Sequence, residues 1–146
     1  ALHRGRASLR RQAAAADAPP APALSLSQEQ AALLGRYVAL FNARDFDSIR
    51  SMLADDVRLD LVNRLRAKGR TEVGEYFHRY SLSSDWQCVP GFVDRRPAVL
   101  MFDPNDLAGR PAYFVLLDWM NDSLVTIRDF RFARYAMEWA EMVPLG

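Results

Sequence analysis

The hydrophobic pattern of the chain changes its period near residue 57, and no other feature constrains the fold as strongly. Before this point apolar side chains recur every three or four residues, as on one face of a helix: Leu34, Tyr37, Val38 and Phe41. After it they alternate with polar ones, as in a half-buried strand: Val57, Leu59 and Leu61 around Arg58 and Asp60. A chain of this length with both patterns predicts one mixed domain plus an appendage.

Residues that favour turns separate the remaining segments. Ser27-Gln-Glu-Gln30 has the form of a capping box, which marks the start of a helix that ends at 42–45. A short second helix is expected from residue 46, with Leu53 on its buried side and Asp55-Asp56 as its end. The later elements are expected to be a strand at 57–61, a polar edge strand or turn at 63–68, a third helix from 69–71 to 80, and strands at 86–93, 98–102, 112–120 and 124–132.

The order of these elements predicts the fold class. Consecutive strands that are joined by short turns must run antiparallel, so the chain is expected to be α+β with a mostly antiparallel sheet. A single strongly curved sheet wrapped around the first helix would bury the apolar, tyrosine-containing face of that helix.

Four segments resemble the SnoaL-like polyketide cyclases and nuclear transport factor 2. They are Leu34-Gly-Arg-Tyr-Val-Ala-Leu-Phe-Asn-Ala-Arg-Asp-Phe-Asp47, Leu53-Ala-Asp-Asp-Val-Arg-Leu59, Gly69-Arg-Thr-Glu-Val73 and Ile127-Arg-Asp-Phe130. The order and spacing of these segments carry the resemblance, which covers Ser27 to about Ala140. It implies a domain over 27–146 with a cone-shaped fold, in which a curved sheet wraps around N-terminal helices and leaves a pocket at its wide end.

The first 26 residues differ in composition from the rest. Residues 1–12 hold no acid and four arginines, Arg4, Arg6, Arg10 and Arg11, and residues 13–26 are expected to form a semi-rigid Ala/Pro linker. Leu2-His-Arg-Gly-Arg-Ala-Ser-Leu-Arg10 resembles the end of the DNA-binding helix of extracytoplasmic-function (ECF) sigma factors, behind which SnoaL-like domains occur. The resemblance implies an upstream part that binds core RNA polymerase and promoter DNA. The alternative is a disordered basic leader, whose arginines would give weak, salt-sensitive phosphate contact.

The body of the chain is slightly acidic, although the whole chain has a formal net charge of +1. Residues 27–146 hold 15 basic and 17 acidic side chains, so charge does not mark this part as a nucleic-acid binder. The single Cys88 excludes an internal disulfide and suits a reducing compartment. No apolar run approaches the roughly 20 residues that span a bilayer, so we expect a cytoplasmic protein without membrane association.

Three aspartates interrupt apolar strands: Asp60, Asp118 and Asp129. Asp118 and Asp129 are the catalytic candidates, because one protonated and one ionised carboxyl in a shared pocket provide acid–base catalysis. Ile127-Arg-Asp-Phe130 resembles the segment that carries one carboxylate in limonene-epoxide-hydrolase-type proteins. Leu116 stands two residues before Asp118, however, where the resemblance requires an arginine. For Asp60, strand alternation favours a solvent-facing position on the outer face of the sheet.

Aromatic residues complete the expected pocket, although most of them also fit an ordinary core. The candidate pocket residues are Tyr37, Phe41, Asp60, Trp86, Trp119, Asp118 and Asp129. A pocket rich in Trp and Tyr suits a flat, apolar ligand. His3 and His78 have no partner at ligand spacing, so neither a metal nor a cofactor is expected. Arg131 and Arg134 have acidic neighbours and are interpreted as a solvated or interface surface.

Together these features favour a C-terminal regulatory or ligand-sensing domain of an ECF sigma factor over an enzyme. The alternative is a small-molecule isomerase, cyclase or epoxide-hydrolase-like enzyme that uses the pocket carboxylates. A homodimer formed through the outer faces of two sheets is a third expectation.

Overall fold

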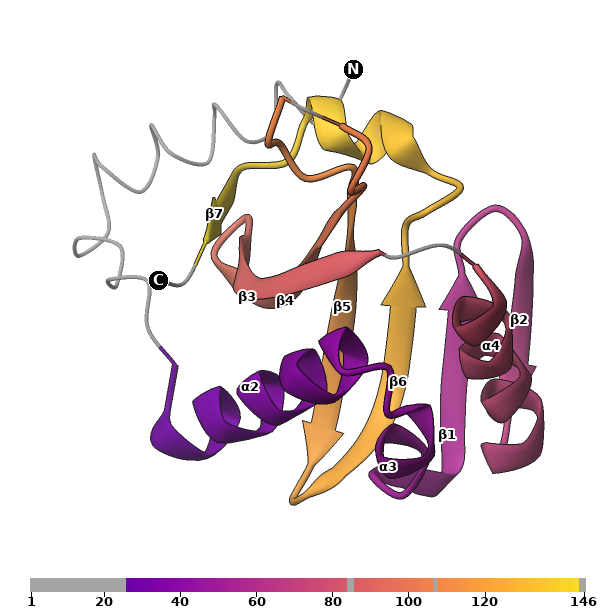
Figure 1. Ribbon diagram of the computed structural model, residues 1–146. Coiled ribbons are helices and arrows are strands. Elements are labelled where there is room, and N and C mark those ends of the chain that lie inside the picture. The colour runs from indigo at the N-terminus through magenta and orange to yellow at the C-terminus, as the bar shows by residue number, and fades with distance from the viewer. Residues whose placement is uncertain (1–25, 84–85, 107, 145–146) are drawn as a thin grey trace, which may run out of the picture.

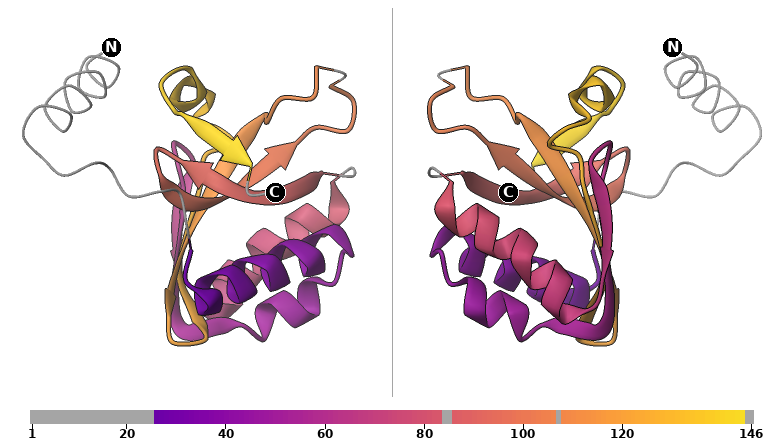
Figure 2. Two further views of the ribbon diagram at one scale, coloured as in Figure 1. Left: turned by 90° about the vertical axis from the view of Figure 1, so that its left-hand side faces the viewer. Right: turned by 90° about the vertical axis from the view of Figure 1, so that its right-hand side faces the viewer.

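The computed structural model describes residues 26–83, 86–106 and 108–144. In this part of the chain a seven-stranded sheet carries three α-helices on one face, which we call the inner face (Figures 1 and 2). The two N-terminal assignments, the stub at 1–12 and the linker at 13–26, lie outside the described residues except for Leu26. The predicted α+β class is confirmed.

The strands follow the order β2-β1-β6-β5-β4-β3-β7 across the sheet. Neighbouring strands pair antiparallel, except β1 and β6, which run parallel. This parallel pair lies side by side in Figure 1 and places the C-terminal ends of both strands at the same edge of the sheet. The strands are β1 (Leu53–Leu61), β2 (Leu65–Lys68), β3 (Gln87–Val93), β4 (Arg96–Phe102), β5 (Tyr113–Met120), β6 (Ser123–Asp129) and β7 (Met142–Pro144).

The helices begin where the sequence places their caps. In α2 (Gln28–Asn42) the Ser27 side chain accepts a hydrogen bond from the Gln30 N–H at 3.1 Å, which confirms the capping box. The short α3 (Phe46–Arg50) is capped by Asp45, whose carboxylate accepts from the Ser48 N–H. The third helix, α4 (Arg70–Leu82), starts directly after Gly69 as predicted.

Two predicted boundaries are wrong, and at the first of them pairing across the sheet outweighs the local pattern. The second helix ends at Arg50 rather than at Asp55-Asp56, and both aspartates lie in β1. The cause is β6: the Leu124 N–H donates to the Met52 carbonyl at 2.8 Å, and Leu53 pairs with Leu124. At the other end β6 stops at Asp129 instead of Phe132, because the chain turns there into the 3-10 helix η1 (Arg134–Glu138).

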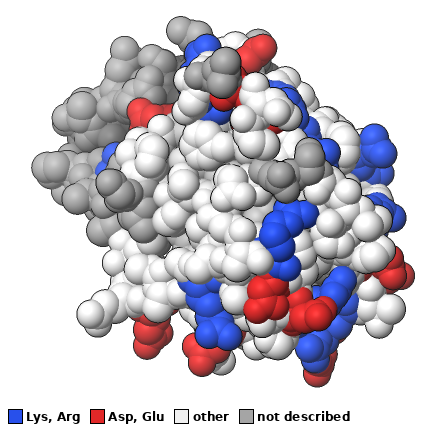
Figure 3. All heavy atoms as spheres, viewed as in Figure 1, with Lys and Arg blue, Asp and Glu red and all other residues white. Residues whose placement is uncertain are grey.

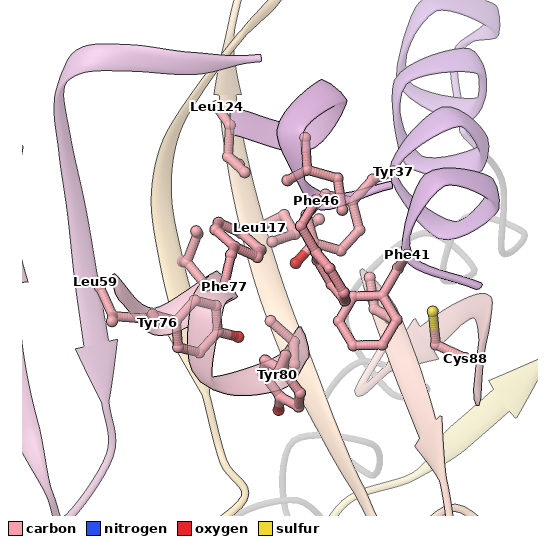
Figure 4. Close-up of a cluster of buried hydrophobic side chains, with 14 of the residues drawn as sticks. Tyr37, Phe41, Phe46, Leu59, Tyr76, Phe77, Tyr80, Cys88, Leu117 and Leu124 are labelled. Carbon is pink, nitrogen blue, oxygen red and sulfur yellow. The ribbon is translucent and has the colours of Figure 1, made fainter. Parts of the chain in front are cut away.

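The sheet is covered on both faces. On the inner face one apolar core joins the three helices to the sheet, and Figure 4 shows side chains of α2 and α4 meeting within it. On the outer face a second cluster lies under the C-terminal segment that includes η1 and β7: Val93, Ala98, Leu100, Phe114 and Leu116. Gly91 permits this cover, because a Cβ at this position would lie 2.6 Å from the Val143 carbonyl oxygen.

The surface carries both signs of charge. Along the lower part of the face in Figure 3, Lys and Arg side chains alternate with Asp and Glu, so no field of a single sign covers it. In the described ranges, none of the helices has the length and apolar character needed to cross a bilayer.

Candidate functional site

A cavity of about 430 Å³ lies between α4 and the C-terminal ends of β1 and β6. The exposed side chains of Leu65 and Phe132 stand at its rim, and the walls are mostly apolar with several charged groups among them. The lining residues are Leu59, Leu61, Arg64, Leu65, Arg66, Ala67, Glu72, Glu75, Tyr76, Arg79, Tyr80, Asp129, Arg131 and Phe132. A concave, apolar site with a few polar groups is typical of small-molecule binding.

The parallel pairing of β1 and β6 builds one wall of the cavity. Leu61 at the end of β1 pairs with Asp129 at the end of β6, and the Val62 N–H donates to the Asp129 carbonyl at 3.0 Å. Helix α4 builds the opposite wall, where Tyr76 and Tyr80 are four residues apart and therefore share one helix face.

Asp129 is the buried polar centre of the site and has no exposed surface. Its Oδ2 accepts hydrogen bonds from the hydroxyls of Tyr76 at 2.6 Å and Tyr80 at 2.8 Å, and its Oδ1 accepts from the Arg131 N–H at 2.8 Å. The Tyr80 hydroxyl also bonds to the Tyr113 hydroxyl. Three tyrosines and one carboxyl thus form a continuous network in the apolar core. Figure 4 shows Tyr76 and Tyr80 with their hydroxyl oxygens among these core side chains.

Burial dominates the protonation chemistry of this network. Desolvation raises the pKa of Asp129 above its ordinary value, and the hydrogen bonds from Tyr76, Tyr80 and the Arg131 N–H oppose this without cancelling it. The pKa values of Tyr76 and Tyr80 are also raised, first by burial and second by the charge of Asp129. The tyrosines therefore stay protonated, and the Asp129 carboxyl is the group of the network that changes charge most readily.

The protonation state of Asp129 decides where the tyrosine hydroxyls point, because each hydroxyl has a single hydrogen to donate. When Asp129 is ionised, Tyr76 and Tyr80 both donate to it and have no hydrogen left for a ligand. When Asp129 is protonated, its own O–H donates to one of these oxygens, and the hydrogen of that tyrosine becomes free. Because Tyr76 and Tyr80 line the cavity, the freed donor is available to a ligand oxygen there.

Asp118 and Asp129 are not brought together. In the antiparallel pairing of β5 with β6, Asp129 lies opposite Val115, three residues from Asp118, and three residues of strand span roughly 10 Å. Asp118 is exposed and lines a separate hollow of about 190 Å³ together with Trp119 and Leu34. A mechanism that uses both carboxylates on one small substrate has no geometric basis in this arrangement.

The other predicted pocket residues occupy three different environments. Asp60 lies on the outer face, where its carboxylate pairs with Arg66 at 3.8 Å and Arg128 at 3.7 Å, and it does not line the cavity. Tyr37 and Phe41 are core residues of α2, 1% exposed each, and stack on one another. Trp86 is buried edge-on against Tyr113 and is not among the residues that line the cavity.

The tyrosines of the network were not singled out from the sequence as functional residues. Tyr76 and Tyr80 fit the apolar face of a helix, and Tyr113 begins an apolar strand, so each has an ordinary core interpretation. The available signal was the hydroxyl itself, because a buried tyrosine needs a hydrogen-bond partner and a buried aspartate needs donors. Arg131 was interpreted as a solvated or interface surface because of its acidic neighbours in the sequence, whereas its backbone N–H donates to Asp129 and the residue lines the cavity.

Two further reactive side chains lie away from the cavity. His78 on α4 is exposed, and Cys88 on β3 is buried, which raises the pKa of its thiol to about 12. Among the residues that the structure describes, no group of three His, Cys, Asp or Glu side chains could hold a metal ion.

Known structures with the same fold clarify the architecture. No protein-family model and no curated protein sequence matches the chain. Similar solved structures include a proposed ketosteroid isomerase from Kribbella flavida (20% identity, TM-score 0.51, covering 67% of this chain and 73% of that chain). A second is the epoxide hydrolase/cyclase-like enzyme SalBIII, which takes part in pyran ring formation (16% identity, TM-score 0.53, covering 70% of this chain and 89% of that chain). A third is an NTF2-like protein of unknown function from Pseudomonas putida (15% identity, TM-score 0.51, covering 69% of this chain and 82% of that chain). The chain therefore has the α+β fold of SnoaL-like and NTF2-like proteins.

Proposed function

We propose that this domain is a small-molecule enzyme of the isomerase or cyclase type, with its active site in the α4 cavity. The observation that carries the proposal is the buried carboxyl of Asp129 on the cavity wall, hydrogen-bonded to two tyrosines that line the same cavity. Donors held in place in an apolar site stabilise an oxygen that gains negative charge during reaction, with little reorganisation. A buried carboxyl that an apolar site keeps protonated, so that it can donate a hydrogen bond, is an established part of such sites.

Each polar group has a distinct role in the proposed site. The Tyr76 or Tyr80 hydroxyl donates to a substrate carbonyl oxygen, and the protonated Asp129 acts as a positioning residue behind it. Of the other acids on the cavity wall, Glu72 accepts from the Lys68 N–H at 3.2 Å, whereas within the described ranges Glu75 accepts no hydrogen bond. Glu75 is therefore the candidate base for a proton on the carbon beside that carbonyl.

The placement of the carboxyls supports this assignment over two-carboxylate epoxide hydrolysis. Structures with this fold include a proposed ketosteroid isomerase and an epoxide hydrolase/cyclase-like enzyme, which supports isomerase or cyclase chemistry as the kind of reaction for this cavity. In this chain Asp118 and Asp129 face different hollows, which leaves one buried carboxyl in the cavity. A single carboxyl linked to tyrosines suits oxyanion stabilisation better than water activation between two carboxylates.

Binding of 2-naphthol, a flat aromatic phenol, tests the site directly. We expect saturable binding in calorimetry, and a loss of about tenfold in affinity for Tyr76→Phe and for Tyr80→Phe, since a hydrogen bond in a dry site contributes roughly 1.5 kcal/mol. Tyr135→Phe is the matched control, because Tyr135 is 59% exposed and does not line the cavity. Absence of binding, or equal losses in all three variants, would contradict the proposal.

The catalytic part of the proposal has a separate readout. Exchange of the α-protons of 2-tetralone for deuterium, followed by NMR, should be accelerated by the protein and slowed by Glu75→Gln and Tyr76→Phe. Binding of 2-naphthol without any accelerated exchange would reduce the function to small-molecule binding.

A second proposal keeps the same cavity but makes it a sensor. The sequence of residues 1–12 supports an attachment to an ECF sigma factor, in which the domain would modulate contacts with core RNA polymerase and promoter DNA. A short tether would hold it at high local concentration beside the DNA-binding part. The reading frame upstream of Ala1 tests this attachment, and reconstituted transcription with and without residues 27–146 tests the regulation.

A further inference from the structure

Arginines are concentrated at the mouth of the cavity. Arg64, Arg66, Arg79 and Arg131 all line it. Arg66 is directed partly to the outer face, where its guanidinium lies 3.8 Å from the Asp60 carboxylate. Among the described residues, no carboxylate lies within 4.0 Å of the guanidinium groups of the other three. The cavity is thus lined by cations that are available to a ligand.

Aromatic rings hold two of these guanidinium groups in place. That of Arg131 lies 5.4 Å from the ring centre of Trp86 and 5.5 Å from that of Phe132, and that of Arg64 lies 4.3 Å from the ring centre of Phe132. Arg131 also lies 5.8 Å from the ring centre of Tyr80, which donates to Asp129. Cation–π contacts of this kind restrict a long side chain without neutralising its charge.

The topology explains why the arginines converge. Arg64 follows the end of β1 by three residues and Arg131 follows the end of β6 by two, and these parallel strands end at the same edge of the sheet. Arg79 lies three residues after Tyr76 on α4, one helical turn further along the cavity wall. The three cations therefore come from the three elements that enclose the cavity.

We propose that the ligand of this cavity is a hydrophobic organic acid, which carries one carboxylate on an apolar body. This inference rests on the proposed function and specifies its substrate class. The apolar body would pack against Leu59 and Leu61, and the carboxylate would bind Arg64, Arg79 and Arg131 at the mouth. Guanidinium groups match a carboxylate with paired hydrogen bonds. The two glutamates on the same wall offset part of the positive charge, which favours a monoanion over a dianion.

Three naphthalene probes distinguish binding of the carboxylate from binding of the rest of the ligand. They are 2-naphthol, 6-hydroxy-2-naphthoic acid and the carboxamide of that acid, which has a similar shape without the charge. We expect the acid to bind about tenfold or more tightly than the amide, because hydrogen bonds to charged groups are about twice as strong as neutral ones. The advantage of the acid should decrease as the salt concentration rises.

Arginine variants identify the side chains that bind the carboxylate. Arg131→Gln and Arg79→Gln should each reduce the preference for the acid over the amide by about threefold to tenfold and leave the affinity for the amide nearly unchanged. Arg110→Gln removes the same charge from an exposed position outside the cavity and is the matched control. Arg79 is exposed, so its variant tests the inference even if Arg131→Gln impairs folding.

The outcomes distinguish this inference from the proposed function. Equal binding of acid and amide, together with binding of 2-naphthol that depends on Tyr76 and Tyr80, would overturn the organic acid and leave the cavity function standing. A preference for the acid that Arg110→Gln reduces as much as Arg79→Gln would also overturn it. If none of the probes binds, both proposals fail.

Discussion

Asp60 and Asp129 are the same residue type on adjacent strands, yet they have opposite environments. Asp60 is directly opposite Arg128 in the β1–β6 pairing, and Asp129 is opposite Leu61, one position further. The side chain of Asp60 is 28% exposed on the outer face and lies between two arginines, whereas that of Asp129 is fully buried on the inner face among tyrosines. Two successive residue pairs of the same two strands therefore hold a surface ion pair and a buried acid.

The difference shows that the face of the sheet, more than the local sequence, decides what a strand aspartate does. On the outer face a carboxylate is in contact with water and guanidinium groups, so it loses little solvation. On the inner face the same group is desolvated, its pKa rises, and its remaining interactions come from hydroxyls and a backbone N–H. Only the second environment provides a proton that a ligand in the cavity can exploit.

Removal of the buried carboxyl should have the largest effect on stability. Asp129→Ala leaves the hydroxyls of Tyr76 and Tyr80 and the Arg131 N–H without their acceptor in the core. We expect a loss of about 3 kcal/mol or more in the free energy of unfolding, measured in urea, since each unsatisfied buried group costs roughly 1–3 kcal/mol. A loss below about 1 kcal/mol would mean that Asp129 resembles Asp60 energetically, and the comparison would fail.

The pH dependence of stability should sharpen the comparison. Because the pKa of Asp129 is raised, the folded state holds the proton more tightly than the unfolded chain, whose aspartates titrate near about pH 3.9. This contribution is present in full below about pH 3.9 and is lost as the pH rises through the folded-state pKa. The stability of the wild type relative to Asp129→Asn, which cannot titrate, should therefore fall as the pH rises above about pH 4.

Urea unfolding of the two proteins at each pH gives this difference, and the comparison cancels the titration of other groups. A relative stability of the wild type that rises with pH would reverse the sign and show that the folded state favours the ionised carboxylate. In that case Tyr76 and Tyr80 would both be occupied by Asp129 at neutral pH, and neither would be free to donate to a ligand.

Removal of the Asp60 carboxylate on the outer face should have the smallest effect on the free energy of unfolding. Asp60→Ala removes two long ion pairs, to Arg66 and Arg128, at a partly exposed site. We expect a loss below about 1 kcal/mol that decreases further in high salt. The same urea titrations at low and high ionic strength measure it. A salt-independent loss near 3 kcal/mol would place Asp60 in the same class as Asp129.

The fold could be predicted largely because its signals are local. The capping box at Ser27, the alternation around Leu59 and the glycine before α4 each reflect the conformation of a few neighbouring residues. The start of β1 and the formation of β7 were missed because they depend on distant partners instead. Leu53 is a strand residue because it pairs with Leu124, and β7 forms because Gly91 leaves room for Val143.

The candidate site was predictable only in part for the same reason. Asp129 stands out in the sequence as a carboxyl between apolar neighbours, but Asp60 and Asp118 have the same appearance. Which of them is buried depends on the face that each occupies. Strand alternation indicated the outer face for Asp60, but the sequence pattern did not distinguish Asp118 from Asp129. The partners of Asp129 lie 49 and 53 residues away on α4, at Tyr80 and Tyr76, so only the folded arrangement identifies them.

A crystal structure with 2-naphthol bound tests the central claim most directly. We predict that the ligand occupies the cavity beside α4, with its oxygen within about 3.2 Å of the Tyr76 or Tyr80 hydroxyl, and that Asp129 keeps its hydrogen bonds to both tyrosines. Density for the ligand in the hollow beside Asp118 and Trp119, or on the surface alone, with an empty cavity at Asp129, would contradict the account.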